Sequence, residues 1–145
     1  MARLFLDTSA LVKLYHTEPD SALVAACVNA SDTLILSRLV LLEFRSTFYG
    51  LVRQAIITLP DALNYISDFE ADVPLYGVLP IEGATFQEAE RLLNTYAATH
   101  ALRPPDALQL ACALLEHLVS PLDSFLTTDA TLARLAALEG LTVQP

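Results

Sequence analysis

The stretch LFLDTSALVK, residues 4–13, contains a transition from a strand pattern to a helix pattern, and this transition indicates the fold. Three apolar residues, 4–6, form a short run typical of a buried strand, and Asp7 ends that run. Thr8 and Ser9 then open a pattern with helical periodicity, since Asp, Thr and Ser favour the start of a helix. A short strand followed directly by a helix is the first unit of a parallel α/β sheet.

The rest of the chain repeats this alternation of short apolar runs and longer helical patterns. Strands are predicted at 4–6, 33–36, 76–81, 125–127 and 141–143. Helices are predicted at 9–16, 21–29, 38–54, 61–70, 83–99, 105–118 and 130–138. The expected fold is a three-layer α/β/α domain with a mostly parallel sheet of four to five strands.

The length of 145 residues fits a single domain spanning 1–145. Pro60 lies between two helical patterns, so a helical hairpin is expected around residues 38–71. The apolar share of 54% is high, and it hints at a further buried surface such as a subunit interface.

Several classes of protein are disfavoured by the composition. No apolar run is long enough to span a bilayer, and the start of the chain lacks the pattern of a signal peptide, so a cytoplasmic location without membrane contact is expected. Cys27 and Cys112 are isolated, which disfavours a zinc site or a disulfide framework. The net charge of -9 disfavours a protein that coats nucleic acid through a basic surface.

Four acidic residues stand where the elements begin or end: Asp7, Glu43, Asp106 and Asp129. In a parallel sheet the carboxyl ends of the strands border one crevice, which is the usual ligand site. Two carboxylates about 4 Å apart repel by roughly 4 kcal/mol at an effective dielectric near 20, so such a cluster needs a cation. A hard cation such as Mg²⁺ suits this role, because it prefers oxygen ligands and binds through a few carboxylates together with a substrate phosphate.

Each acid also has a plainer interpretation. Asp7 and Asp129 precede helices and could simply be N-caps. Asp106 follows Pro104 and Pro105 and could complement a helix dipole. Glu43 could lie on a solvated flank, although no Lys or Arg stands three or four residues away to pair with it.

Taken in order, the segment 4–13, Glu43, the segment RPPDALQLA at 103–111 and Thr127-Thr128-Asp129 resemble the PIN-domain family. The likeness extends over the whole chain and is greatest to the VapC-type ribonuclease toxins. It implies that Asp7, Glu43, Asp106 and Asp129 are catalytic and bind the metal, with Ser9 and Thr127 as hydroxyl neighbours. The implied activity is Mg²⁺- or Mn²⁺-dependent hydrolysis of RNA phosphodiester bonds.

The resemblance also implies partners, namely an RNA substrate, a cognate antitoxin protein and a second copy in a homodimer. Apolar residues of the expected hairpin could receive an antitoxin or could simply complete the core: Phe48, Tyr49, Leu51, Ile56, Ile57, Tyr65 and Phe69. The basic residues Lys13, Arg38, Arg45 and Arg103 could contact phosphates or could be ordinary surface charges.

Two other functions compete with the nuclease. The first is a catalytically silent PIN-like module that only binds a partner. The second is a phosphatase or phosphoacceptor domain with Asp7 as nucleophile, which is disfavoured because Ser9 occupies the position where haloacid dehalogenases have a second Asp.

Overall fold

The computed structural model describes residues 1–144 and contains one central sheet in that range. Its strands are β1 (Arg3–Leu6), β2 (Thr33–Ser37), β3 (Gly77–Leu79), β4 (Ser124–Leu126) and β5 (Val143–Gln144). The strand order is β3-β2-β1-β4-β5, and every pairing is parallel. The predicted parallel α/β/α fold is confirmed.

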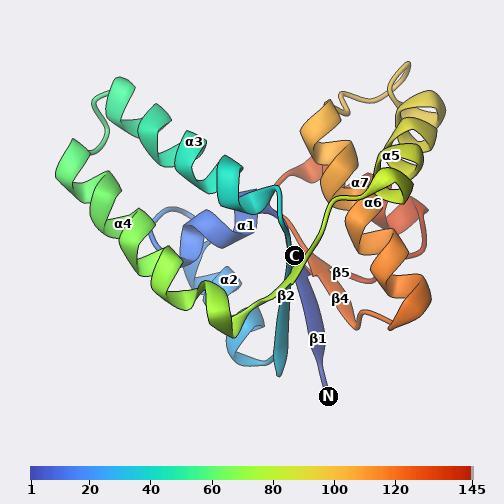
Figure 1. Cartoon of the computed structure of the whole chain (residues 1–145), viewed down its shortest axis with the longest axis horizontal. Coiled ribbons are helices and arrows are strands. Elements are labelled where there is room, and N and C mark those ends of the chain that lie inside the picture. Colours follow the sequence, from blue (N-terminus) through green and yellow to red (C-terminus); the bar gives the residue numbers. More distant parts are fainter. Residues whose placement is uncertain (145) are drawn as a thin grey trace.

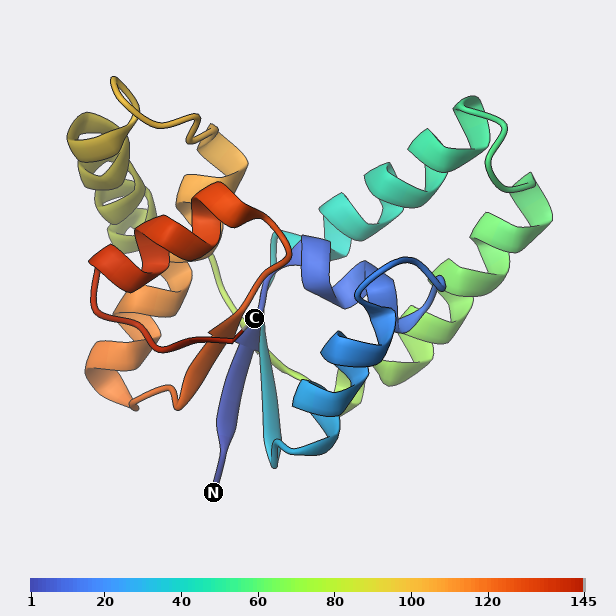
Figure 2. The ribbon, with the colours of Figure 1, turned by 180° about the vertical axis from the view of Figure 1, so that it is seen from behind.

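Helices cover both faces of this sheet, as Figures 1 and 2 show. On one side lie α1 (Thr8–Leu11), the 3-10 turn η1 (Val12–Leu14), α2 (Ser21–Asn29), α3 (Val40–Arg53) and α4 (Leu59–Asp72). A second turn, η2 (Val73–Leu75), leads into β3. On the other side lie α5 (Gly83–Tyr96), α6 (Pro104–Val119) and α7 (Ala130–Leu138). Among the helices of residues 1–144, none is long and apolar enough to cross a bilayer.

The alternation of side chains along β1 divides the core into two layers. Leu4 and Leu6 belong to the layer under α1–α4, whereas Phe5 points into the layer under α5–α7. There Phe5 stacks on Phe125 of β4, with 5.5 Å between the ring centroids. Both faces of the strand are therefore buried, which explains its uninterrupted apolar run.

Several predicted boundaries were wrong, and local chemistry explains two of them. The strand expected at 76–81 ends at Leu79 because the following Pro80 has no N–H to donate to a sheet. The helix expected from 61 begins at Leu59, because Thr58 accepts a hydrogen bond from the backbone N–H of Asp61 and so caps it.

Other boundaries differ without changing the architecture. The helix expected at 9–16 is the four-residue α1 followed by η1, and the last strand lies at Val143–Gln144 rather than 141–143. Helices α3 and α4 pack side by side, joined by the segment 54–58. The chain leaves β1, β2 and β4 at one end of the sheet, and the candidate site lies there.

Candidate functional site

A cleft of about 310 Å³ opens at the carboxyl ends of the central strands, and all four predicted acids line it. Asp7 follows β1, Glu43 lies in the first turn of α3, Asp106 lies in the first turn of α6, and Asp129 immediately precedes α7. The remaining lining residues are Thr8, Ser9, Val12, Lys13, Glu18, Thr47, Arg103, Gln109 and Thr128. Positions more than a hundred residues apart in sequence therefore meet at one edge of the sheet.

Asp7 is the most deeply buried of the four acids, with 4% of its surface exposed. Its carboxylate accepts hydrogen bonds from the backbone N–H of Ala10 at 3.0 Å and from the Thr127 hydroxyl at 2.6 Å. The Ser9 hydroxyl adds contacts at 2.8 and 3.0 Å. Burial raises the pKa of Asp7 to about 6, although these hydrogen bonds oppose the rise; the charge of Asp106 adds to it.

Asp129 and Asp106 lie at the starts of two different helices. Asp129 Oδ1 accepts from the backbone N–H of Leu132 at 2.9 Å and caps α7. Asp106 Oδ2 accepts from Nε of Arg103 at 3.2 Å. Asp7 likewise caps α1. The capping interpretation is thus correct for Asp7 and Asp129, and it coexists with their position in the cleft.

Glu43 is held by two donors that reach the same oxygen. Its Oε1 accepts from the hydroxyl of Thr8 at 2.9 Å and from Nε2 of Gln109 at 2.8 Å. Nε2 of Gln109 also donates to Oγ1 of Thr8 at 3.0 Å. Glu43 is therefore not a freely solvated flank residue, because α1 and α6 both restrain it.

Two cations border the acids. Lys13 Nζ forms an ion pair with Glu18 at 2.7 Å, and Arg103 pairs with Asp106 while 74% of its own side chain stays exposed. Burial opposes ionisation of Glu18, but the hydrogen bonds from Lys13 and His16 outweigh it and hold the pKa of Glu18 below its usual value. Of the other predicted basic contacts, Arg45 pairs with Glu70 outside the cleft.

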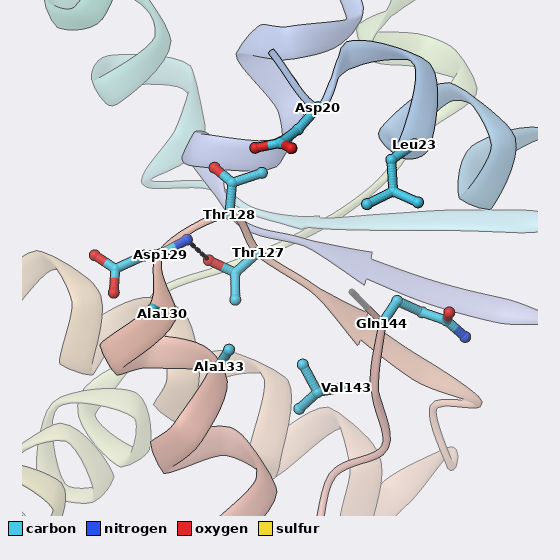
Figure 3. A pocket seen from close by; sticks show the side chains of 9 residues that line it. All are labelled: Asp20, Leu23, Thr127, Thr128, Asp129, Ala130, Ala133, Val143 and Gln144. Carbon is cyan, nitrogen blue, oxygen red and sulfur yellow. Dashed lines mark hydrogen bonds between the residues drawn. The ribbon is translucent and has the colours of Figure 1, made fainter.

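The two hydroxyl neighbours meet at Asp7 from different sides. Oγ of Ser9 lies 3.1 Å from Oγ1 of Thr127 and accepts from the backbone N–H of Thr128 at 3.0 Å. Thr127 also accepts from the backbone N–H of Asp129, as Figure 3 shows. Thr127 does not line the cleft itself but lines an adjoining hollow of about 320 Å³ with Asp20, Leu23, Val143 and Gln144.

The donor set fits a hard divalent cation. It consists of carboxylates with hydroxyls and one amide, and such oxygen ligands are preferred by Mg²⁺ and Mn²⁺. Within residues 1–144, however, no three Asp, Glu, His or Cys side chains form a ready metal-holding group. Mg²⁺ needs only one or two direct carboxylates because it keeps several of its waters, so a cleft lined by dispersed acids is compatible with it.

Sequence reasoning assigned no role to Thr8 and Gln109, which the structure places against Glu43. A signal for Gln109 was present, because it is the only polar residue between Ala107 and Leu115 of an otherwise apolar helix. Nothing in the sequence distinguished Thr8 from an ordinary residue of a first helical turn.

The cysteines offer no competing chemistry. Cys27 and Cys112 are free thiols. Burial raises the pKa of Cys112 to about 11, although a hydrogen bond with Ser37 partly lowers it. This thiol therefore stays protonated and poorly nucleophilic at neutral pH.

Comparisons with known proteins find a matching family model and similar curated proteins. A family model described as "PIN domain" matches residues 4–138. The chain is also similar to Ribonuclease VapC45 and Ribonuclease VapC49, which are given for two strains of Mycobacterium tuberculosis. Each is 34% identical over 117 residues, and the alignment covers 79% of this chain and 76% of the relative.

Solved structures share the fold at lower identity. FitAcB from Neisseria gonorrhoeae superposes with a TM-score of 0.70 and 19% identity, covering 98% of this chain and 96% of that one. VapC20 from Mycobacterium tuberculosis, described as a sarcin-ricin loop cleaving toxin, gives a TM-score of 0.68 with 16% identity and coverage of 98% and 99%. VapBC-5 from the same species gives a TM-score of 0.61 with 22% identity, covering 99% of this chain and 96% of that one.

Proposed function

Because the chain belongs to the PIN-domain family, we propose that it is an endoribonuclease that hydrolyses RNA phosphodiester bonds at the carboxylate-lined cleft. The observation that carries the proposal is the meeting of Asp7, Glu43, Asp106 and Asp129 around one cleft. Two of these acids lie in the first turns of α3 and α6, and the other two immediately precede α1 and α7. Helix capping gives no reason for all four to line the same cleft.

Asp7, Glu43, Asp106 and Asp129 would hold Mg²⁺ or Mn²⁺ in this proposal. A divalent cation bound there supplies positive charge to the scissile phosphate and lowers the pKa of an attacking water. The cation also offsets the repulsion among acids in a chain whose net charge is already -9. Thr127 and Ser9 contribute by donating hydrogen bonds to the ionised Asp7.

Lys13 and Arg103 are the basic residues that line the cleft. Arg103 is mostly exposed, so its guanidinium can turn from Asp106 toward an RNA phosphate at little cost. Lys13 is held by Glu18, and in this proposal it fixes one wall of the cleft and adds positive charge near the incoming strand. The scarcity of other cations leaves the bound metal as the main source of phosphate affinity.

The direct test is cleavage of a structured RNA by purified protein with Mg²⁺ or Mn²⁺ and with EDTA. We expect cutting only with metal, and a loss of at least a hundredfold in Asp106→Asn, because that substitution removes a charged ligand while nearly preserving shape. Asp68→Asn is the matched control, since Asp68 is exposed on the outer side of α4 and does not line the cleft.

The competing proposal is a catalytically silent module that only binds a partner. It predicts no cutting under any condition and no change in melting temperature when Mn²⁺ is added. Equal cutting by wild type and Asp106→Asn would instead indicate a contaminating nuclease and would contradict the proposed site.

We further propose that the enzyme is the toxin of a toxin–antitoxin pair. The support is the similarity to VapC ribonucleases and to chains from VapBC assemblies. In the hairpin of α3 and α4, Phe48 and Phe69 are fully buried, so for these two residues the structure favours the alternative that they complete the core. Its tip leaves Ile56, Leu59 and Leu63 exposed, and these are our candidates for antitoxin contact.

A homodimer is proposed on a separate surface. An apolar hollow of about 450 Å³ lies beside the edge strand β3 and is lined by Arg38, Leu39, Leu41, Leu42 and Ile81. Leu42 is 70% exposed, so the hollow presents apolar surface to the solvent. A second copy of the chain would cover both this hollow and the free edge of β3.

A further inference from the structure

Gln109 occupies a position that an apolar side chain would be expected to take. It lies one turn after Asp106 on α6, so the two side chains share the helix face that borders the cleft. Only 2% of Gln109 is exposed, and its neighbours along the helix are apolar from Ala107 to Leu115. A buried amide is costly unless its hydrogen-bonding groups are matched, so this residue needs an explanation.

The contacts of Gln109 determine which way its amide faces. A carboxylate only accepts hydrogen bonds, so the group 2.8 Å from Oε1 of Glu43 must be Nε2 rather than the amide oxygen. The same nitrogen donates to Oγ1 of Thr8 at 3.0 Å, and that hydroxyl donates to Glu43 at 2.9 Å. The amide nitrogen therefore donates to both members of the pair formed by Thr8 and Glu43.

This orientation leaves the other end of the amide unmatched. Oε1 of Gln109 is the buried side-chain atom without a hydrogen-bond partner among residues 1–144. A helix that needed Gln109 only for packing would be better served by an apolar residue of similar length. The fold instead leaves the amide oxygen unpaired, while the amide nitrogen donates to Glu43 and to Thr8.

We propose that Gln109 is the positioning residue that, together with Thr8, fixes the Glu43 carboxylate for the divalent cation of the cleft. This inference rests on the proposed metal-dependent function. A glutamate on a helix surface has several rotatable bonds and would otherwise sample many rotamers. Because both donors bind Oε1, the carboxylate is anchored through one oxygen and presents the other to a ligand. Hydrogen bonds that orient a metal ligand commonly change affinity by 10- to 100-fold.

The test measures Mn²⁺ binding to RNA-free protein by isothermal titration calorimetry, in wild type and Gln109→Met. Methionine keeps the length and apolar packing but donates nothing, so we expect Mn²⁺ to bind 10- to 100-fold more weakly. Cleavage should fall at limiting Mn²⁺ and recover at saturating Mn²⁺, with the KM for RNA unchanged. Gln87→Met on α5 is the matched control, because Gln87 is exposed and outside the cleft.

Two further variants separate positioning from a structural tie between α3 and α6. Gln109→His keeps an N–H donor of similar reach and should restore most of the Mn²⁺ affinity. Thr8→Val removes the second donor at nearly constant shape and should weaken binding in the same direction, which tests the network even where Gln109→Met fails to fold.

An altered melting temperature with unchanged Mn²⁺ affinity in both Gln109→Met and Thr8→Val would overturn the inference while leaving the metal site intact. Absence of Mn²⁺ binding in the wild type would overturn the proposed function as well, so the two failures are distinguishable.

Discussion

Asp7 is buried, which disfavours its charged form, yet its proposed role as a cation ligand requires that charge. It is nearly enclosed, and burial raises its pKa to about 6 despite donors from Thr127, Ala10 and Ser9. A proposed cation ligand must be ionised, and at neutral pH this carboxylate is charged in surroundings that penalise the charge. The metal-free protein is therefore strained at Asp7 near neutral pH.

The raised pKa of Asp7 makes the free energy of unfolding depend on pH. In the unfolded chain Asp7 loses its proton near its ordinary pKa of 3.8, whereas the folded protein retains it up to about pH 6. The free energy of unfolding therefore falls as pH rises through this window, and the penalty is fully present above it. At about 1.36 kcal/mol per pKa unit, the penalty is roughly 3 kcal/mol.

Asp7→Asn should remove this penalty. In EDTA at pH 7.5 the variant should be more stable than wild type by up to roughly 3 kcal/mol, and its stability should vary less between pH 4 and 6.5. Urea denaturation across that range measures both effects, with Asp68→Asn as the control for loss of a surface charge. A wild-type protein whose stability rises between pH 4.5 and 6.5, beyond the trend of that control, would contradict the assignment.

Among the helices, α4 shows how a local signal sets a boundary. Thr58 accepts from the backbone N–H of Asp61 at 3.2 Å, and the Asp61 carboxylate accepts from the backbone N–H of Thr58 at 3.1 Å. This reciprocal capping box satisfies donors that a helix end leaves free, and it lowers the pKa of Asp61. The sequence predicted that this helix begins at Asp61, two residues after its actual start at Leu59. The prediction was late because Pro60 lies inside the first turn and does not precede it.

Thr58→Ala should lower the free energy of unfolding by about 1 kcal/mol, because it removes the side-chain acceptor of the cap. Chemical denaturation of the metal-free protein measures the change. Ser46→Ala serves as the control, since Ser46 is exposed in the middle of α3, and it should change stability by less than about 0.5 kcal/mol. Equal effects of the two substitutions would show that the cap contributes nothing specific.

At the scale of the whole molecule, β3 is one of the two edge strands of the sheet, with β5 at the opposite edge. The apolar hollow containing Leu42 lies there, and a second hollow nearby is lined by Arg38, Leu41, Val73, Val78 and Pro80. These features, together with the apolar share of 54%, support the proposed dimer.

Sedimentation equilibrium should give about twice the chain mass of 15.8 kDa for the wild type. Leu42→Glu should shift the protein to the monomer while preserving its far-UV circular dichroism spectrum, because desolvating a carboxylate at an apolar interface is costly. Leu138→Glu, at an exposed position of α7, should leave the mass unchanged. A dimer that persists in Leu42→Glu would move the interface elsewhere.

The sequence by itself determined the alternation of strands and helices, because each element has its own apolar period and its own start and stop residues. It also drew attention to Asp7, Glu43, Asp106 and Asp129, since an acid at the end of a buried strand or in the first turn of a helix is visible locally. For these reasons the parallel sheet of the fold could be predicted from the sequence.

Only the tertiary structure decided which groups surround those acids. Thr127 donates to Asp7 across 120 positions of sequence, and Gln109 reaches Glu43 across 66. Such contacts depend on the order of the strands and the rotation of each helix, and neither leaves a local trace in the chain. The pKa of Asp7 has the same origin, because desolvation is a property of the assembled core and not of any one segment.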